Sequence, residues 1–359
     1  MTQAIAPDPQ VIEQKIGAAY GALGGLLSGA MMHIGGNLGL YKAMAGAGPV
    51  TSTELAARTG LAERFVREWL YQQTASGIVD HEGAERYVLG PEAAMVFADP
   101  TFALGMAQVL PFIPKFFSEA LLAEGAFRTG LGRTYDDAGE DGARMIDAMF
   151  SGWNRTALTS DALPKIAGVV ERLQAGGKVV DVGCGAGAAD IAIAQSFPAA
   201  EIHGYDNSEH ALNVAREDAA AAGATNVTFH NSDTDPLPTD PTFDLALSLD
   251  CLHDMNRPDL AAAAIRKSLK PDGAWFIVDI DSAPTFEENL ANPMAPMLYA
   301  ASIMLCLQSS ACTPDGLALG PMALSEPEMK KLVTAAGFTR FARVADLAHP
   351  MNTYYEVRP

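Results

Sequence analysis

The C-terminal half of the chain alternates short apolar runs with stretches that fit helices. A small-residue helix is expected at 188–196, and Lys270–Gly273 indicates a helix stop and a turn. This alternation predicts a doubly wound parallel sheet, in which ligands bind at the carboxyl ends of the strands. The apolar runs predict strands at 178–182, 201–206, 227–230, 243–250 and 274–280.

A different pattern fills the first hundred residues. Thr51–Gly60 and Leu61–Gly77 read as two helices, the first opened by a Thr/Ser cap with Glu54 and closed by a glycine. Two short strands at 78–81 and 86–89 then form a hairpin. The order helix, helix, hairpin predicts a winged-helix unit.

Residues Ile16–Tyr41 contain no Asp, Glu, Lys or Arg, but they contain eight glycines. A membrane span is one interpretation, yet the glycines, His33 and Asn37 favour a buried or dimer-interface pair of helices. Glycines on facing helices permit close backbone approach. We therefore expect a homodimer formed through the N-terminal domain, and no contact with a membrane.

Length and charge narrow the classes of function. The 359 residues, 49% of them apolar, are enough for two domains, expected at 1–165 and 166–359. The net charge of -19 disfavours nucleic acid and anionic membranes as partners. The winged helix leaves a DNA-binding regulator as an alternative. The charges on its second helix cancel, which disfavours DNA binding; they are Glu63, Arg64, Arg67 and Glu68.

The four cysteines show no disulfide framework, no C-x-x-C pair and no preceding secretory signal, which predicts a reducing cytoplasm. Cys251, His253 and Asp254 invite a metal interpretation. No second cluster of ligands is evident, so we expect no metal. The cysteines are Cys184, Cys251, Cys306 and Cys312.

The strongest chemical signal is the turn after the first strand. Gly183, Gly185 and Gly187 stand at alternate positions just after Asp181, so a ligand can approach bare main chain. Dinucleotide folds use the wider G-x-G-x-x-G spacing, and a carboxylate here would repel phosphates. S-adenosylmethionine, whose sulfonium is positively charged, fits better than NAD. The plain alternative is a glycine turn that only closes the strand–helix unit.

Polar residues after the later strands complete the expected cofactor site. Asp206 ends the second strand 25 residues beyond Asp181, where a carboxylate can accept both ribose hydroxyls. Ser232 and Asp233 follow the third strand and are expected near the adenine edge. We assign Asn207 and Ser248 to the same cofactor site.

Residues 178–280 resemble the class I S-adenosylmethionine-dependent methyltransferases, whose first motif, E/D-x-G-x-G-x-G, matches Asp181–Gly187. The resemblance implies a Rossmann-like fold, S-adenosylhomocysteine as product, a strand at 341–347 and an antiparallel last strand at 352–358. The order of domains is similar to that of small-molecule O-methyltransferases and of a bacterial methyltransferase family with the same N-terminal module. The second group is matched by Glu68-Trp69-Leu70, 127–132 with Tyr135, and 352–355.

Within that group the chain resembles bacterial S-methyltransferases that convert 4-methylthio-2-hydroxybutyrate to its dimethylsulfonio product, on the route to dimethylsulfoniopropionate. The acidic composition is compatible with a marine source. Where most of the broader family carries a histidine after a methionine, this chain has the more apolar run Ser302–Leu307.

The acceptor atom decides which side chains the chemistry needs. A hydroxyl acceptor needs a base, and His253 stands where plant-type O-methyltransferases keep the His of their His-Asp-Trp motif, although Met255 replaces the Trp. A thioether is already nucleophilic, so His253 would then orient or anchor the substrate. Tyr135 is the second catalytic candidate. In the plainer interpretations, His253 is a helix cap or a satisfied buried residue, Tyr135 belongs to a chain crossing between the domains, and Tyr299 is a core residue. The expected substrate contacts are Arg133, Tyr299, Met304 and Leu305, beneath a covering insertion at 281–322.

Overall fold

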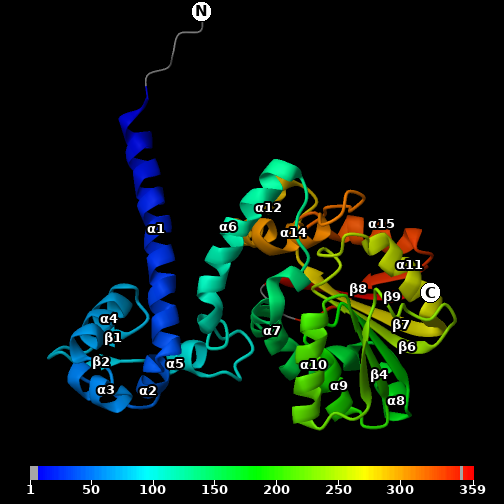
Figure 1. The fold of residues 1–359 in the computed structure, drawn as a ribbon, viewed down its shortest axis with the longest axis horizontal. Coiled ribbons are helices and arrows are strands. Elements are labelled where there is room, and N and C mark those ends of the chain that lie inside the picture. The colour runs from blue at the N-terminus through cyan, green and yellow to red at the C-terminus, as the bar shows by residue number, and fades with distance from the viewer. Residues whose placement is uncertain (1–6, 348–350) are drawn as a thin grey trace, which may run out of the picture. The chain divides into compact units, whose positions relative to one another are not determined.

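The computed structural model describes residues 7–347 and 351–359. The chain divides into two compact units, Met1–Pro114 and Lys115–Pro359. The first unit contains helices α1 (Pro9–Asn37), α2 (Leu40–Met44), α3 (Ser52–Thr59), α4 (Glu63–Ala75) and α5 (Pro91–Ala98), the turn η1 (Leu110–Phe112), and strands β1 (Asp80–His81) and β2 (Tyr87–Val88) (Figure 1).

The winged-helix prediction is confirmed in its elements. Thr51 and Glu54 form a reciprocal capping box at the start of α3, and the helix ends at Gly60, whose φ of 70° suits glycine. The antiparallel pair β1–β2 follows α4. Trp69, Leu55 and Leu70 lie in a core that the helices and the hairpin share. The arginines of α4 pair with glutamates of the same helix, Arg64 with Glu68 and Arg67 with Glu63.

The region without charged residues differs from the expectation. Residues 16–37 belong to one continuous helix, α1, because no proline interrupts them and glycine is tolerated within a helix. Residues 9–27 of α1 are exposed, whereas Gly35 packs against Trp69. Among the described residues, no helix is long and apolar enough to cross a membrane.

The second unit is built on a seven-stranded sheet with the order β5-β4-β3-β6-β7-β9-β8. Neighbouring strands from β5 to β7 are parallel, and β9 is antiparallel to both β7 and β8. The predicted antiparallel last strand is thus confirmed. The strands are β3 (Lys178–Val182), β4 (Glu201–Asp206), β5 (Val227–Asn231), β6 (Phe243–Leu249), β7 (Leu269–Ile280), β8 (Arg340–Arg343) and β9 (Asn352–Arg358).

Helices cover both faces of this sheet (Figure 1). Alternate residues of β3 point to opposite sides, so Val179 belongs to the core that includes α8 and α9 while Val180 belongs to the core that includes α11 and α15. The helical elements are α6 (Ile113–Thr129), α7 (Gly139–Thr156), α8 (Val169–Gln174), α9 (Ala188–Ser196), α10 (Glu209–Ala222), α11 (Pro258–Ser268), α12 (Phe286–Asn289), α13 (Ala295–Ala301), α14 (Leu307–Ser310), α15 (Glu326–Ala335), and the short turns η2 (Asp136–Ala138), η3 (Leu158–Ala162), η4 (Leu163–Lys165) and η5 (Ser302–Cys306).

The boundary between the units lies nearer the N-terminus than the predicted division after Lys165. The segment 115–165 belongs to the second unit. The reason is packing: α7 contacts α9 and α10, and the ring of Trp153 lies 5.2 Å from that of Tyr354 on β9. An amphipathic helix joins whichever core buries its apolar face.

The strand bounds also differ in detail. The strand predicted at 274–280 is β7, which begins earlier than predicted, because α11 ends at Ser268 and the strand starts directly at Leu269. Its pairing with β6 has a register shift next to Phe243. β8 is shorter than the predicted strand 341–347 and ends at Arg343. β9 spans the predicted residues 352–358.

Candidate active site

The glycine turn lies between β3 and α9, at the carboxyl end of the central strand. Gly183, Gly185 and Gly187 all have positive φ, at 86°, 54° and 73°. A Cβ on Gly187 would lie 2.6 Å from the Phe229 ring, and one on Gly183 would lie 2.7 Å from Cys251. A Cβ on Gly185 would meet no atom within 4 Å. Two glycines are therefore needed for packing, and Gly185 leaves bare backbone facing open space.

Asp206 ties the end of β4 to this turn. Its Oδ2 accepts a hydrogen bond from the Gly185 backbone N–H at 2.9 Å, and its Oδ1 accepts one from the Ser208 N–H at 2.9 Å. Burial raises the pKa of Asp206, and these N–H donors oppose that shift. The carboxylate is held at the strand end, where it lines the pocket described next.

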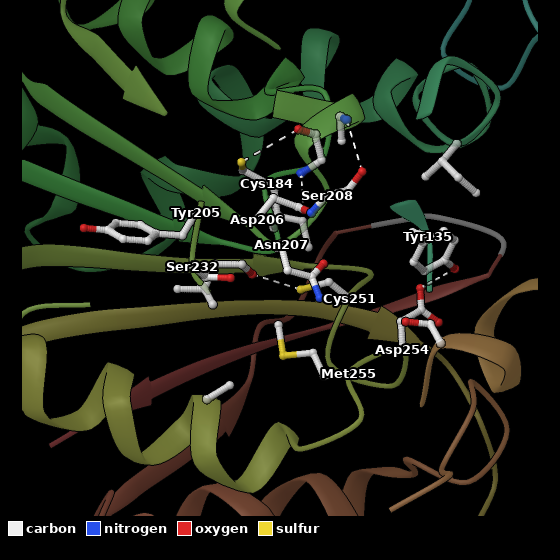
Figure 2. Close-up of a pocket in the computed structure, with 18 of the residues that line it drawn as sticks. Tyr135, Cys184, Tyr205, Asp206, Asn207, Ser208, Ser232, Cys251, Asp254 and Met255 are labelled. Atoms are coloured by element: carbon white, nitrogen blue, oxygen red, sulfur yellow. Dashed lines mark hydrogen bonds between the residues drawn. The ribbon is translucent and has the colours of Figure 1, made fainter. Parts of the chain in front are cut away.

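A pocket of about 680 Å³ opens along the carboxyl ends of β3, β4 and β6. This size is in the usual range for a cofactor or drug-sized ligand. Figure 2 shows Asp206, Asn207, Ser232 and Met255 at this cavity, with Tyr135 and Asp254 close together at another part of it. Of the predicted cofactor residues, the pocket brings together Gly183, Gly185, Asp206, Asn207, Ser232 and Asp233.

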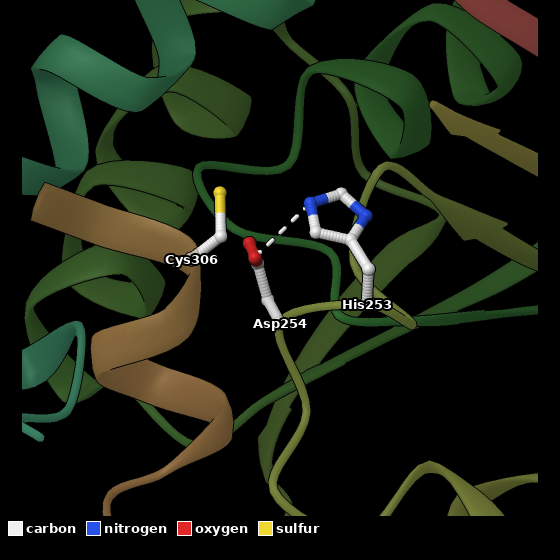
Figure 3. Close-up of side chains that lie close together, drawn as sticks. All are labelled: His253, Asp254 and Cys306. Atoms are coloured by element: carbon white, nitrogen blue, oxygen red, sulfur yellow. Dashed lines mark ion pairs between the residues drawn. The ribbon is translucent and has the colours of Figure 1, made fainter. Parts of the chain in front are cut away.

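A chain of hydrogen bonds and one ion pair runs from the pocket into the protein. The Tyr135 hydroxyl donates to Asp254 Oδ2 at 2.7 Å, and His253 Nε2 lies 3.1 Å from Asp254 Oδ1 (Figure 3). On its other side, His253 Nδ1 lies 2.6 Å from Asp279 Oδ1 on β7. Tyr135 and Asp254 line the pocket, whereas His253 is only 3% exposed and lies behind them.

The charges of this network favour a protonated histidine. Burial lowers the pKa of His253, but the carboxylates of Asp254 and Asp279 outweigh burial and hold it well above its usual value. An imidazolium that pairs with two carboxylates has no lone pair with which to accept a proton. Burial and the charge of Asp254 likewise raise the pKa of Tyr135, which keeps the phenol neutral.

Cys306 joins this network from η5, which lies in the insertion. Its Sγ, His253 Nε2 and an oxygen of Asp254 all lie within 4.8 Å of one another (Figure 3). Burial raises the pKa of Cys306 to about 11, so the sulfur is a neutral thiol rather than the thiolate that metals prefer. Since His253 already pairs with Asp254, we assign no metal to this cluster.

Several predicted residues lie outside the pocket lining. Arg133 pairs with the buried Glu119 at 3.1 Å and donates to the Asp137 carbonyl. Tyr299 packs against Phe286. Ser248 is fully buried and accepts a hydrogen bond from the Trp275 indole. Those outside the lining are Arg133, Asp181, Gly187, Ser248, His253, Tyr299, Met304 and Leu305.

The structure also adds lining residues that sequence reasoning missed. Asp147, Phe150, Ser151 and Asn154 form one face of α7, and their spacing of three and four residues was the available signal. The insertion contributes Ser309 and Cys312. No local signal distinguishes these two, because the insertion was predicted only as a cover.

Comparison with known proteins supports the fold and the nature of this site. Residues 173–319 match the model of the methyltransferase domain family, and residues 27–98 match that of the Rv2258c-like winged HTH domain. Human N-acetylserotonin methyltransferase in complex with SAM is similar over 99% of both chains, with 16% identity and a TM-score of 0.67. An O-methyltransferase family protein from Burkholderia thailandensis is similar over 98% of both chains, with 15% identity and a TM-score of 0.68.

Two curated relatives match shorter segments. A fatty-acid O-methyltransferase of Mycolicibacterium smegmatis is 29% identical over 132 residues, which cover 36% of this chain and 47% of that protein. An (S)-tetrahydroprotoberberine N-methyltransferase of Eschscholzia californica is 28% identical over 118 residues, 33% of each chain. This chain therefore matches less than half the length of either relative.

These findings define the class to which the fold belongs. The chain has the Rossmann-like fold of the class I methyltransferases, preceded by a winged helix-turn-helix domain. The matched methyltransferase domain contains the glycine turn, Asp206 and part of the pocket lining, while Tyr135 and the lining residues of α7 precede it in the chain.

Proposed function

We propose that this protein transfers the methyl group of S-adenosylmethionine to a small molecule, with S-adenosylhomocysteine as product. One observation carries the proposal. A glycine turn with open space at Gly185 lies beside Asp206, the carboxylate expected to bind the ribose hydroxyls, in a single cavity of about 680 Å³. The residues that line this cavity carry five carboxylates, and such a setting suits a cationic sulfonium donor. These carboxylates are Asp147, Asp206, Asp233, Asp250 and Asp254.

The preferred acceptor is a thioether. Both nitrogens of His253 pair with carboxylates, so the histidine is poorly placed to remove a proton from a hydroxyl. A thioether sulfur attacks through its own lone pair, and the positive charge of the sulfonium product is favoured beside Asp254. Positioning and exclusion of water then supply the acceleration. In this mechanism Tyr135 and Asp254 contact the substrate, and His253 holds Asp254 in place.

The specific acceptor that we propose is 4-methylthio-2-hydroxybutyrate, on the resemblance to S-methyltransferases of dimethylsulfoniopropionate synthesis. Its carboxylate needs a cation. Of the described residues that line the pocket, Arg257 is the one lysine or arginine. Asp259 binds its Nε and Nη2, while its Nη1 meets the exposed Asp315 at 3.3 Å. A substrate carboxylate can replace Asp315 there.

An O-methyltransferase remains the second candidate, because the His253–Asp279 pair has the geometry of an oriented base. The decisive experiment supplies labelled S-adenosylmethionine with 4-methylthio-2-hydroxybutyrate, methionine, a neutral thioether and a catechol, followed by mass spectrometry. A thioether methylase labels sulfur at a rate that is flat from pH 6 to 9, and His253→Gln raises its KM more than it lowers its kcat. Label on a phenolic oxygen alone, with His253→Gln inactive, overturns the thioether proposal.

We also propose a cytoplasmic homodimer formed through the N-terminal unit. Ile16, Tyr20, Leu23 and Leu27 recur at spacings of three and four residues along α1, and each side chain is at least half exposed. A second copy of this helix would cover such a stripe. The four cysteines are free thiols, which fits a reducing compartment.

A further inference from the structure

The segment 132–137 lies between α6 and α7, and its start is held from outside the pocket. Arg133 donates a hydrogen bond to the buried Glu119 of α6 at 3.1 Å. Gly132 lies so close to the insertion that a Cβ on it would overlap the backbone carbonyl of Gln308. Helix α6 and the insertion therefore fix the start of this segment together.

Two consecutive residues of the segment reach different parts of the pocket. The Tyr135 hydroxyl donates to Asp254 Oδ2 at 2.7 Å, and we call these two residues the acceptor half. Asp136 Oδ1 accepts one hydrogen bond from the Ser208 hydroxyl at 2.9 Å and one from the His210 backbone N–H at 3.2 Å. Burial raises the pKa of Asp136, but hydrogen bonds led by these two donors outweigh burial and lower it, so Asp136 is ionised at neutral pH.

Ser208 connects Asp136 to the carboxylate that is expected to bind the cofactor. The Ser208 backbone N–H donates to Asp206 Oδ1 at 2.9 Å, and the Gly185 N–H donates to Asp206 Oδ2 at 2.9 Å. We call Gly185, Asp206 and Ser208 the cofactor half, and Figure 2 shows Asp206 and Ser208 apart from the acceptor half. A ligand that binds Asp206 therefore also restrains Ser208 and, through it, Asp136.

The plainer roles of Asp136 are filled by other groups. Helix α10 has its own N-cap, because the Ser208 hydroxyl accepts a hydrogen bond from the Ala211 N–H. Asp136 also lies outside the pocket lining, so it is not placed to bind a ligand directly. Its contacts with Ser208 and His210 instead join the segment to the start of α10.

We propose that Asp136 is a positioning residue that couples the two halves of the pocket. When the cofactor half is filled, Asp136 holds Tyr135 in place at the acceptor half. This inference rests on the proposed function. Tyr135 and Asp136 belong to one short turn, in which the Ala138 N–H donates to the Tyr135 carbonyl, so restraint of one residue restrains the other. In-line methyl transfer depends on the position of the acceptor, and a displacement of about 1 Å can cost about a hundredfold in rate.

Hydrogen exchange of the full chain, measured by mass spectrometry, tests the coupling with S-adenosylhomocysteine as the probe. In the unsubstituted protein this ligand should slow exchange both at the glycine turn, 183–187, and in the segment 132–137. In Asp136→Ala it should still slow exchange at 183–187 but no longer in 132–137. Asp136→Asn keeps an oxygen that can accept both hydrogen bonds, so it should restore the slowing.

Binding and turnover should separate in the same variant. Asp206 keeps both of its N–H donors in Asp136→Ala, so the affinity for S-adenosylhomocysteine, measured by calorimetry, should fall by less than about threefold. With S-adenosylmethionine and 4-methylthio-2-hydroxybutyrate, the kcat/KM for the acceptor should fall at least about tenfold. The matched control is Asp141→Ala, which removes an exposed carboxylate from the first turn of α7 and should change neither quantity.

Unchanged exchange in 132–137 when S-adenosylhomocysteine binds the unsubstituted protein overturns the inference, whether or not Asp136→Ala folds. Equal slowing in Asp136→Ala and in the unsubstituted protein also overturns it. Failure to bind S-adenosylhomocysteine at all sinks the proposed function, and the inference with it. If exchange behaves as expected but 4-methylthio-2-hydroxybutyrate is not methylated, the proposed acceptor is wrong and the positioning role stands.

Discussion

A Cβ would meet different surroundings at each glycine of the turn, so substitution by alanine should have a different effect at each of the three positions. Gly187→Ala places a Cβ 2.6 Å from Phe229 at a positive φ. Left-handed backbone and overpacking together should lower the free energy of unfolding by about 2 to 5 kcal/mol. Gly185→Ala has room and should cost only about 1 to 2 kcal/mol.

The two variants separate stability from binding. Chemical denaturation measures the first, and calorimetric titration with S-adenosylmethionine measures the second. Because a methyl group on Gly185 projects into open space at the pocket, Gly185→Ala should weaken the cofactor more than it destabilises the fold. Equal losses of stability in both variants, with full affinity in Gly185→Ala, would contradict this division of roles.

The position of a single side chain was predictable where it follows from the local backbone. Asp206 lies at a strand end next to a glycine turn, and both features are visible in the sequence. Arg133 could not be placed in this way, since its guanidinium is captured by Glu119, fourteen residues earlier on α6. Which of two charged groups an arginine meets depends on helix packing, and the sequence pattern carries no such information.

The exposed stripe of α1 leads to a prediction about assembly. Leu23→Glu places a charge in the middle of the stripe that Ile16, Tyr20 and Leu27 form with it. Burying an unpaired carboxylate between two helices is costly, so the variant should shift a dimer to monomer without loss of helix content. Light scattering coupled to gel filtration measures the change.

Gln14→Glu adds the same charge to α1 at a position outside that stripe and serves as the control. It should leave the mass of the particle unchanged. A Leu23→Glu protein that remains dimeric would mean that α1 does not form the interface.

The elements themselves were mostly predictable, because periodicity is a local property. Strands β3, β4, β5 and β9 follow the expected bounds closely. The region without charges forms the single helix α1 up to Asn37, since glycine content alone does not end a helix when no proline is present. Whether α7 belongs to the first or the second compact unit likewise depended on which core buries its apolar face.

The protein as a whole should become less stable as the pH rises from 5 to 7. Burial, followed by the charges of Asp206 and Asp279 respectively, raises the pKa of both Asp181 and Asp250 from 3.8 to about 7. Between pH 4 and 7 the folded state therefore binds more protons than the unfolded state, so stability falls as the pH rises through this range. The slope is about 1.4 kcal/mol per pH unit for each such group.

Urea denaturation of the ligand-free protein at pH 5, 6, 7 and 8 measures this slope. The raised pKa of His253 acts in the same direction from about pH 6.5 upward, because its stabilisation is complete below the ordinary pKa of 6.5 and is lost as the pH rises through the raised one. Asp250→Asn removes one contributing group and should flatten the curve. Stability that increases from pH 5 to 7 would show that these carboxyls are ionised in the folded state.

The strand positions, the glycine turn and the acid at the end of β4 could be read from the chain alone, because each depends on residues that are close in sequence. The rest depended on three-dimensional packing. Tyr135, Asp254 and Cys306 are separated by up to 171 positions, and only the fold brings them to one place. Asp190 is a polar residue in an alanine-rich helix by sequence, and only the fold buries it within reach of the charge of Asp181.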